Sequence, residues 1–110
     1  MDVRGHLDLL LLAVLADAEG AHGYAVIAAL RERSTGAFDV PEGTVYPALH
    51  RLERAGLVVS RWEQVAPRRR RVYELTPDGR AARAAKQSEW RSFVNSVQAV
   101  IGPVAAQAPA

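Results

Sequence analysis

The sequence contains no cysteine, which excludes disulfide bonds, thiol nucleophiles and cysteine-ligated metal sites. Its longest apolar run, residues 9–16, is much shorter than the roughly 20 residues that a membrane-spanning helix needs. No cationic segment with a cleavage site precedes this run. We therefore expect no secretory signal, no membrane association and a cytoplasmic protein.

The groupings of residues that catalysis or metal binding requires are also missing. The three histidines, His6, His22 and His50, are scattered along the chain, and neither a Ser/His/Asp grouping nor a pair of carboxylates can be identified. No glycine-rich phosphate loop joins a strand to a helix, and no histidine and carboxylate cluster has the spacing of metal ligands. The sequence therefore predicts no catalytic residues, no bound metal and no cofactor.

Positive charge is unevenly distributed along the 110 residues, which are 49% apolar and long enough for one small globular domain. Residues 1–20 contain one arginine and four acidic residues, whereas residues 57–75 contain five arginines and two glutamates. The net charge of +2 alone is a weak argument for nucleic-acid binding. Its distribution indicates one strongly positive region.

Residues 40–58 are typical of a recognition helix followed by the first residues of a wing. One apolar stripe at helical spacing consists of Val45, Ala48, Leu49 and Leu52. The opposite face, which suits phosphates and base edges, carries Gly43, Pro47, His50, Arg51 and Arg54.

We expect the helix to begin near Gly43 or Thr44, which places Pro47 in the first turn, where its missing N–H is no loss. Gly56 is expected to end the helix. An amphipathic helix with a solvated basic face is the alternative, and the neighbouring elements decide between the two.

The first predicted helix, residues 7–16, is apolar on nearly every side. Such a helix must be covered all round, and a chain of this length has little material to do so. We therefore expect a second copy of the chain to cover Leu7, Leu10 and Leu11.

The remaining segments complete the order of a winged helix-turn-helix. The predicted elements are a turn over 17–22, a helix over 23–33, a strand over 57–64, a turn over 65–69, a strand over 70–75 and a last helix over 77–100. Thr76 is a suitable N-cap for the last helix, and Pro77 suits its first position. We predict a mainly α fold with a small β-hairpin, which is a winged helix-turn-helix plus a C-terminal dimerisation helix.

The second half of the last helix carries an apolar seam at alternating spacings of three and four residues. The seam consists of Trp90, Phe93, Val94, Val97, Val100 and Ile101. We expect it to pack against a helix of a second copy. Residues 1–76 then form the DNA-binding domain, with the first helix also in the dimer contact. Residues 77–101 form the dimerisation helix, and residues 102–110 form a flexible tail.

Residues 22–79 carry a set of motifs that resembles the PadR family of bacterial transcriptional regulators. The matching segments are His22-Gly23-Tyr24, Gly43-Thr44-Val45-Tyr46-Pro47-Ala48-Leu49, Arg51-Leu52-Glu53, Ala55-Gly56-Leu57-Val58, Arg71-Val72-Tyr73-Glu74-Leu75-Thr76 and Gly79. The short C-terminal region of one helix resembles the small branch of that family. The resemblance implies a homodimer that is formed by the first and last helices, binds a near-palindromic operator in double-stranded DNA and usually acts as a repressor.

The recognition helix supplies the first group of expected DNA contacts. Its exposed face offers Tyr46, Pro47, His50, Arg51 and Arg54, with both arginines on phosphates rather than bases. Gly43 and Thr44 lie at its start, where free N–H groups and the positive helix end favour a phosphate. The family resemblance places the Tyr46 hydroxyl on DNA, and packing in the core is the alternative.

Four consecutive arginines at the predicted wing tip, Arg68, Arg69, Arg70 and Arg71, form the second group. Alternate residues of a strand point to opposite faces, so two or three of these side chains reach one DNA backbone or minor groove. A solvated turn is the alternative interpretation. Beside a recognition helix, the run is typical of a phosphate clamp with salt-dependent affinity. Trp62 is expected to pack beneath the wing.

The resemblance also implies a cleft between subunits where an aromatic residue of the last helix stacks on planar hydrophobic molecules. Trp90 and Phe93 are the candidates, and Leu12 and Asp8 are expected to border the cleft. Plain dimer core is the alternative for both aromatic residues. We interpret the protein as a dimeric DNA-binding repressor that a small hydrophobic ligand releases. A winged-helix protein-interaction module without DNA binding is the alternative.

Overall fold

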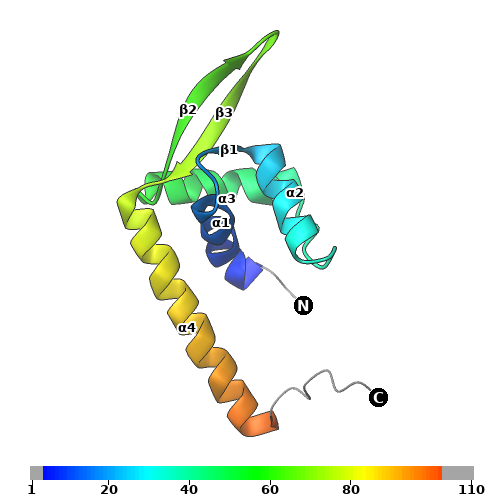
Figure 1. Ribbon diagram of the computed structural model, residues 1–110, viewed down its shortest axis with the longest axis vertical. Coiled ribbons are helices and arrows are strands. Elements are labelled where there is room, and N and C mark those ends of the chain that lie inside the picture. Colours follow the sequence, from blue (N-terminus) through cyan, green and yellow to red (C-terminus); the bar gives the residue numbers. More distant parts are fainter. Residues whose placement is uncertain (1–3, 103–110) are drawn as a thin grey trace.

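The computed structural model describes residues 4–102 (Figure 1). Its elements are the 3-10 helix η1 (Arg4–His6), α1 (Leu7–Ala16), β1 (Ala21–His22), α2 (Gly23–Arg33), α3 (Glu42–Arg54), β2 (Val58–Val65), β3 (Arg68–Leu75) and α4 (Pro77–Ile101). α1, α2 and α3 form a cluster beneath the sheet, and α4 runs away from this body as a long helix (Figure 1). The predicted mainly helical fold with a small β-hairpin is confirmed.

The core lies between the first three α-helices and the base of the sheet. Its most deeply buried side chains are Leu11, Leu12, Leu15, Val26, Val45, Leu49, Val58 and Tyr73. The expectation that a partner chain covers α1 is wrong for Leu7 and Leu11, which are 3% and 0% exposed within a single chain. α2, α3, β3 and α4 all contact α1 and together bury these side chains. Leu10 is only partly buried, so part of its surface remains accessible to a partner.

The sheet has three antiparallel strands in the order β1-β3-β2, one more strand than the predicted hairpin. The added strand β1 occupies a segment expected as a turn, and its pairs with β3 are Ala21 with Tyr73 and His22 with Val72. The hairpin is also longer than expected, because Val65 pairs with Arg68 and the turn contains only Ala66 and Pro67. Pro67 lies outside the ladder, where its missing N–H leaves no strand hydrogen bond unmade. All four arginines of the wing therefore belong to β3.

The base of β3 is buried on both faces. Tyr73 and Leu75 point into the helical core, whereas Val72 points to the other face and is nevertheless only 6% exposed. The backbone of Gly20 covers Val72, because a Cβ on Gly20 would lie 2.8 Å from Val72 Cγ1. Gly20 also has a φ of +145°, so both the conformation and the close approach require glycine.

α3 begins earlier than expected. Its first residue is Glu42 and its N-cap is Pro41, so Pro47 lies in the second turn rather than the first. There the missing N–H removes the donor that the Gly43 carbonyl would normally have, and the exposure of Gly43 lets water take that place. The predicted apolar stripe of α3 is confirmed, since Val45, Ala48, Leu49 and Leu52 are all buried.

Thr76 caps α4 as predicted. Its Oγ1 accepts a hydrogen bond from the Gly79 N–H at 3.0 Å and donates one to the Gly56 carbonyl at 2.7 Å. Gly79 lies directly against the carbonyl of Leu57, where a side chain would collide. α4 then runs for 25 residues, and the segment 103–110 of the predicted tail lies outside the described residues. Within residues 4–102, no helix is both long and apolar enough to span a bilayer.

Candidate nucleic-acid interface

α3 exposes one continuous stripe on the side away from the core. Its members, Gly43, Pro47, His50 and Arg54, follow one another at spacings of four, three and four residues, and all four are exposed. This spacing places them on one face of the helix. The buried stripe on the opposite side fixes the rotation of α3. Four of the predicted DNA contacts therefore share one exposed face of α3.

Tyr46 lies on a flank of α3 rather than on this stripe. Its ring packs against Gly23 at the start of α2, and a Cβ on Gly23 would overlap the ring. Burial, and secondly the neighbouring Glu42 carboxylate, raise the pKa of Tyr46. The structure therefore favours the core-packing alternative, because Gly23 makes room for the ring at the contact between two helices.

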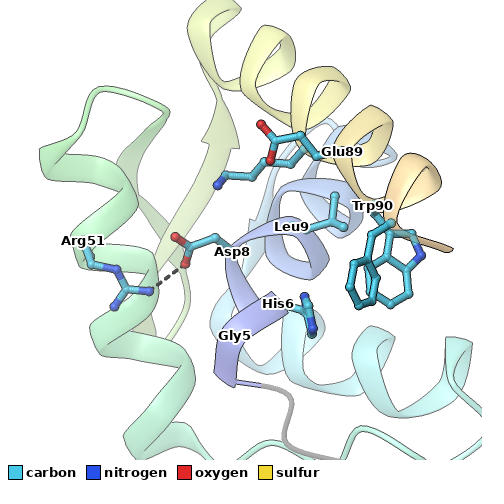
Figure 2. Close-up of a pocket in the computed structure, with 9 residues that line it drawn as sticks. Gly5, His6, Asp8, Leu9, Arg51, Glu89 and Trp90 are labelled. Atoms are coloured by element: carbon cyan, nitrogen blue, oxygen red, sulfur yellow. Dashed lines mark hydrogen bonds and ion pairs between the residues drawn. The ribbon is translucent and has the colours of Figure 1, made fainter. Parts of the chain in front are cut away.

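Arg51 lies on the other flank of α3. Its Nη2 is 2.6 Å from Oδ1 of Asp8 on α1, and the two side chains are 55% and 34% exposed. Figure 2 shows this ion pair reaching from one helix to the other at the edge of a groove. The expected phosphate contact of Arg51 is therefore replaced in this structure by a link to α1.

The start of α3 is a poorer anion site than expected. The Thr44 N–H donates a hydrogen bond to the Pro41 carbonyl at 3.0 Å, so it is not free. Glu42 adds a negative charge to the first turn of α3, which makes this helix end less favourable for a phosphate. Gly43, exposed on the stripe, remains the candidate at this end of the helix.

The wing divides its arginines between two faces. The cross-strand pairs are Trp62 with Arg71, Glu63 with Arg70, Gln64 with Arg69 and Val65 with Arg68. Residues directly opposite one another in an antiparallel pair point to the same face, so Arg69 and Arg71 share one face and Arg68 and Arg70 share the other. The prediction of alternating faces is confirmed. Figure 1 shows the hairpin projecting well beyond the helical body.

Trp62 does not pack beneath the wing, contrary to expectation. Its side chain is 53% exposed, and the guanidinium carbons of Arg69 and Arg71 lie 4.7 Å and 5.1 Å from the centroid of the ring. These distances are typical of cation–π contacts. The strand alternation of residues 57–64 places Trp62 on the face that continues from the core, but β2 extends past the helices before it reaches this residue. The Trp62 indole therefore packs against the Arg69 and Arg71 side chains rather than against the core.

A groove of about 370 Å³ lies between α1, α3 and α4 (Figure 2). Its lining consists of Gly5, His6, Asp8, Leu9, Arg51, Lys86, Glu89, Trp90 and Phe93. The rings of Trp90 and Phe93 are 5.8 Å apart, and His6 meets the Trp90 ring edge-on at 5.0 Å. Three of the four predicted ligand contacts, Trp90, Phe93 and Asp8, thus lie together.

Leu12 is the exception, and its predicted ligand contact is wrong. It is 0% exposed in the core, and Leu9, three residues earlier, lines the groove instead. On a helix that is apolar on nearly every side, the sequence alone does not show which leucines are buried and which are exposed. Within the described chain, no group of three histidine or acidic side chains could hold a metal ion.

The second half of α4 exposes an apolar stripe to solvent. Trp90 is 37% exposed, Phe93 57% and Ile101 73%, and Val94 and Val97 between them are partly buried. The stripe begins at Trp90, which contacts His6 of η1, and continues to Ile101 at the end of α4, which points away from the helical body (Figure 1). Five of the predicted dimer contacts therefore form one unpartnered surface on α4.

Comparison with known proteins gives a consistent result. The model of the family described as "Transcriptional regulator PadR-like family" matches residues 11–85. Transcriptional regulator Rv3488 of Mycobacterium tuberculosis is 54% identical over 52 residues, which are 47% of this chain and 49% of that protein. This match thus spans about half of that relative's length.

Solved structures match over nearly the whole chain. A transcriptional regulator from Clostridium thermocellum superposes with a TM-score of 0.83 at 26% identity, over 90% of this chain and 96% of that one. A PadR family transcription regulator from Clostridium difficile superposes with a TM-score of 0.72 at 34% identity, over 86% of this chain and 95% of that one.

Proposed function

Because this chain belongs to the PadR-like family of transcriptional regulators, a family of DNA-binding regulators and not of enzymes, we propose that it is a homodimeric repressor of a near-palindromic operator. The observation that carries this proposal is the exposed stripe of α3, with His50 and Arg54, beside an arginine-rich hairpin. A DNA-binding regulator of bacterial genes would act in the cytoplasm, and we propose that location for this protein.

In the proposed complex, α3 enters the major groove and the hairpin holds the flanking backbone. His50 faces the bases, Arg54 contacts a nearby phosphate, and the exposed wing arginines contact phosphates only. The wing therefore contributes affinity that does not depend on sequence, and the stripe contributes selectivity. In this division residues 1–76 bind DNA, and residues 77–101 dimerise.

The apolar stripe of α4 supports the proposed dimer. A surface that combines Trp90, Phe93 and Ile101 is unusual for a monomer of this size and marks an interaction site. A second groove, about 260 Å³ and largely apolar, is lined by Leu10, Ala13, Val14, Leu30, Arg33, Ser34 and Phe38. We place the α4 stripe of the second copy against α1 and this groove, which would also cover Leu10. The two recognition helices would then bind half-sites one or two helical turns apart, about 34–36 Å for each turn.

The groove beside Trp90 is the proposed effector site. Its aromatic floor suits a planar hydrophobic molecule, and Trp90 and Phe93 are the residues on which such a molecule would stack. Asp8 and Arg51 line the same groove, and Arg51 belongs to α3. A ligand that displaces either partner of this ion pair would therefore change the support of the recognition helix. Release from DNA follows only if the ligand prefers the conformation that does not fit the operator.

Fluorescence anisotropy with duplexes tests the proposed function directly. The protein is titrated against labelled DNA from upstream of its own gene and against a scrambled duplex, at several salt concentrations. We expect tight binding to the upstream duplex and a negative slope of log K against log salt. Absence of binding to both duplexes at low salt would contradict a DNA-binding role and favour a winged-helix module for a protein partner.

Reversing the charges of Arg69 and Arg70 separates these roles, because only a DNA-binding protein loses affinity for every duplex.

A further inference from the structure

The recognition helix and the wing are joined by a chain of side-chain contacts. Ser60 on β2 donates a hydrogen bond to the Glu53 carboxylate on α3. Arg71 on β3 donates from Nε to Ser60 Oγ at 2.9 Å, and its Nη2 lies 3.8 Å from Glu53 Oε2. Three elements thus meet at one carboxylate, and each polar group has a partner on another element.

Trp62 extends this chain toward the tip of the wing. The Arg71 guanidinium that contacts Glu53 also lies 5.1 Å from the Trp62 ring centroid, and Arg69 lies 4.7 Å from the same ring. The order of contacts is therefore Glu53, Ser60, Arg71, Trp62, Arg69. We call these five residues the wing strut.

The two arginines of the strut differ in their surroundings. Arg71 is partly buried, with a side chain 37% exposed, and a carboxylate already faces it. Arg69 is exposed, and no ion pair within residues 4–102 engages it. A phosphate approaching Arg71 would have to compete with Glu53, whereas a phosphate approaching Arg69 would not.

The wing strut meets the core at Tyr73. Tyr73 is 1% exposed on the same face of β3, directly opposite Ser60. Burial raises the pKa of Tyr73, Arg71 lowers it, and Glu53 and Tyr46 raise it. The charges of Arg71 and Glu53 therefore affect the pKa of Tyr73 at the base of the wing, where the hairpin meets the core.

We propose that Arg71 is a positioning residue that, together with Trp62, fixes the angle of the wing against α3, and that Arg69 makes the phosphate contact on this face. The inference rests on the proposed DNA-binding function and divides the four arginines by role. The Glu53 carboxylate holds Arg71 on one side, and the Trp62 indole contacts it on the other. Arg71 therefore fixes the indole against which Arg69 also lies. The strut sets the distance between the major-groove contact and the backbone contact before DNA arrives.

The salt dependence of operator binding separates the two roles. Each phosphate contact contributes about 0.9 to the slope of log K against log salt on B-DNA. The dimer carries Arg69→Ala in both subunits, so we expect this variant to make the slope less steep by about 1.8, or two phosphate contacts. We expect Arg71→Ala to weaken binding by roughly three- to tenfold, the effect of losing a local coupling, with the slope unchanged. Arg91→Ala, at an exposed position of α4 outside the wing, is the matched control and should leave both the affinity and the slope unchanged.

A conservative variant adds a second criterion. Arg71→Lys keeps the charge but loses the Nε donor and the planar group that lies on Trp62. If Arg71 positions the wing, Arg71→Lys should bind as weakly as Arg71→Ala. Wild-type affinity and slope for Arg71→Lys would show that charge alone matters and would overturn the inference.

Free protein provides a readout that does not depend on DNA. Trp62 and Trp90 are the two tryptophans of the chain, so a Trp90→Phe background leaves Trp62 as the single fluorophore. In that background we expect Arg71→Ala to increase the acrylamide quenching of Trp62 and to lower its fluorescence anisotropy. Unchanged quenching and anisotropy would overturn the strut, as would a slope lowered equally by Arg71→Ala and Arg69→Ala. If the parent protein binds no duplex at low salt, the proposed function fails, and the quenching experiment still decides whether the strut exists.

Discussion

Arg51 of α3 and Asp8 of α1 form an ion pair, with Nη2 and Oδ1 2.6 Å apart, at the edge of the groove that contains Trp90. The pair removes one cation from the DNA-binding side of the recognition helix. It also gives the groove a direct contact with that helix. One positive charge of α3 is thus already paired with a carboxylate of the same chain, at its surface.

Removal of this carboxylate should free Arg51 for DNA. An exposed ion pair contributes only about 0–1 kcal/mol, so we expect Asp8→Ala to change the melting temperature by no more than a few degrees. We expect the released arginines, one in each subunit of the proposed dimer, to strengthen binding and to make the salt slope steeper by about 1.8, the contribution of two phosphates. Asp17→Ala breaks a similar exposed pair with Arg33 on α2 and is the matched control. A slope for Asp8→Ala equal to that of Asp17→Ala would show that Arg51 does not reach DNA.

Arg54 on the exposed stripe of α3 should contribute affinity for DNA. We expect Arg54→Ala to weaken binding to both duplexes by about 1.5–3 kcal/mol, the range for the loss of a hydrogen bond to a charged group. Arg91→Ala removes an equally exposed arginine from α4 and should leave the affinity unchanged. Anisotropy titrations of both variants on the upstream duplex and on scrambled DNA make the comparison. Equal affinities for the two variants would mean that α3 does not enter the groove.

Sequence patterns identified the elements better than they identified the orientation of single side chains. The stripe of Val45, Ala48, Leu49 and Leu52 defined the buried side of α3 correctly, because its period matches that of a helix. The same period could not separate Arg51 from Arg54. Both lie off the apolar stripe, and only the approach of α1 with Asp8 decides that one of them is paired inside the protein.

The errors on α1 and on the wing have similar causes. A helix that is apolar on nearly every side has no clear apolar period, so its buried and accessible sides depend on how the other elements pack around it. Trp62 follows the strand alternation correctly, but whether that face is covered depends on where the helical body ends. The hairpin is longer than the predicted turn over 65–69 allows, because Pro67 lies in a turn of two residues and the strands pair on either side of it.

A charge on the α4 stripe should dissociate the proposed dimer. Val97 lies between the exposed aromatic residues and Ile101, so we expect Val97→Asp to place an unpaired carboxylate in the interface. Ser96→Asp introduces the same charge at an exposed neighbouring position and should leave the dimer intact. Sedimentation velocity over a range of protein concentrations distinguishes the two variants. Identical sedimentation of Val97→Asp and wild type would remove this stripe from the interface.

Trp90 should be required for binding of flat aromatic molecules. We expect Trp90→Ala to reduce by several-fold the fluorescence enhancement of the probe 1-anilinonaphthalene-8-sulfonate, because the largest ring of the groove is lost. Trp62→Ala is the matched control, because it removes the other tryptophan, which lies on the wing and does not line the groove. Sedimentation of the same samples shows whether a lost signal reflects the groove or a dissociated dimer. An unchanged enhancement with Trp90→Ala would exclude the groove as the probe site.

Alkaline conditions should destabilise the protein through Tyr73. Burial raises the pKa of Tyr73 in the folded chain above its unfolded value of about 10, so the folded state holds this proton more tightly than the unfolded state. The stabilisation is therefore complete below about pH 10 and is lost as the pH rises through the folded pKa. Urea unfolding followed by circular dichroism between about pH 8 and pH 11 measures this loss. We expect Tyr73→Phe to flatten the pH dependence and Tyr24→Phe, at a residue that is 63% exposed, to change it less. A Tyr73→Phe protein that loses stability as steeply as wild type would show that another group titrates in this range.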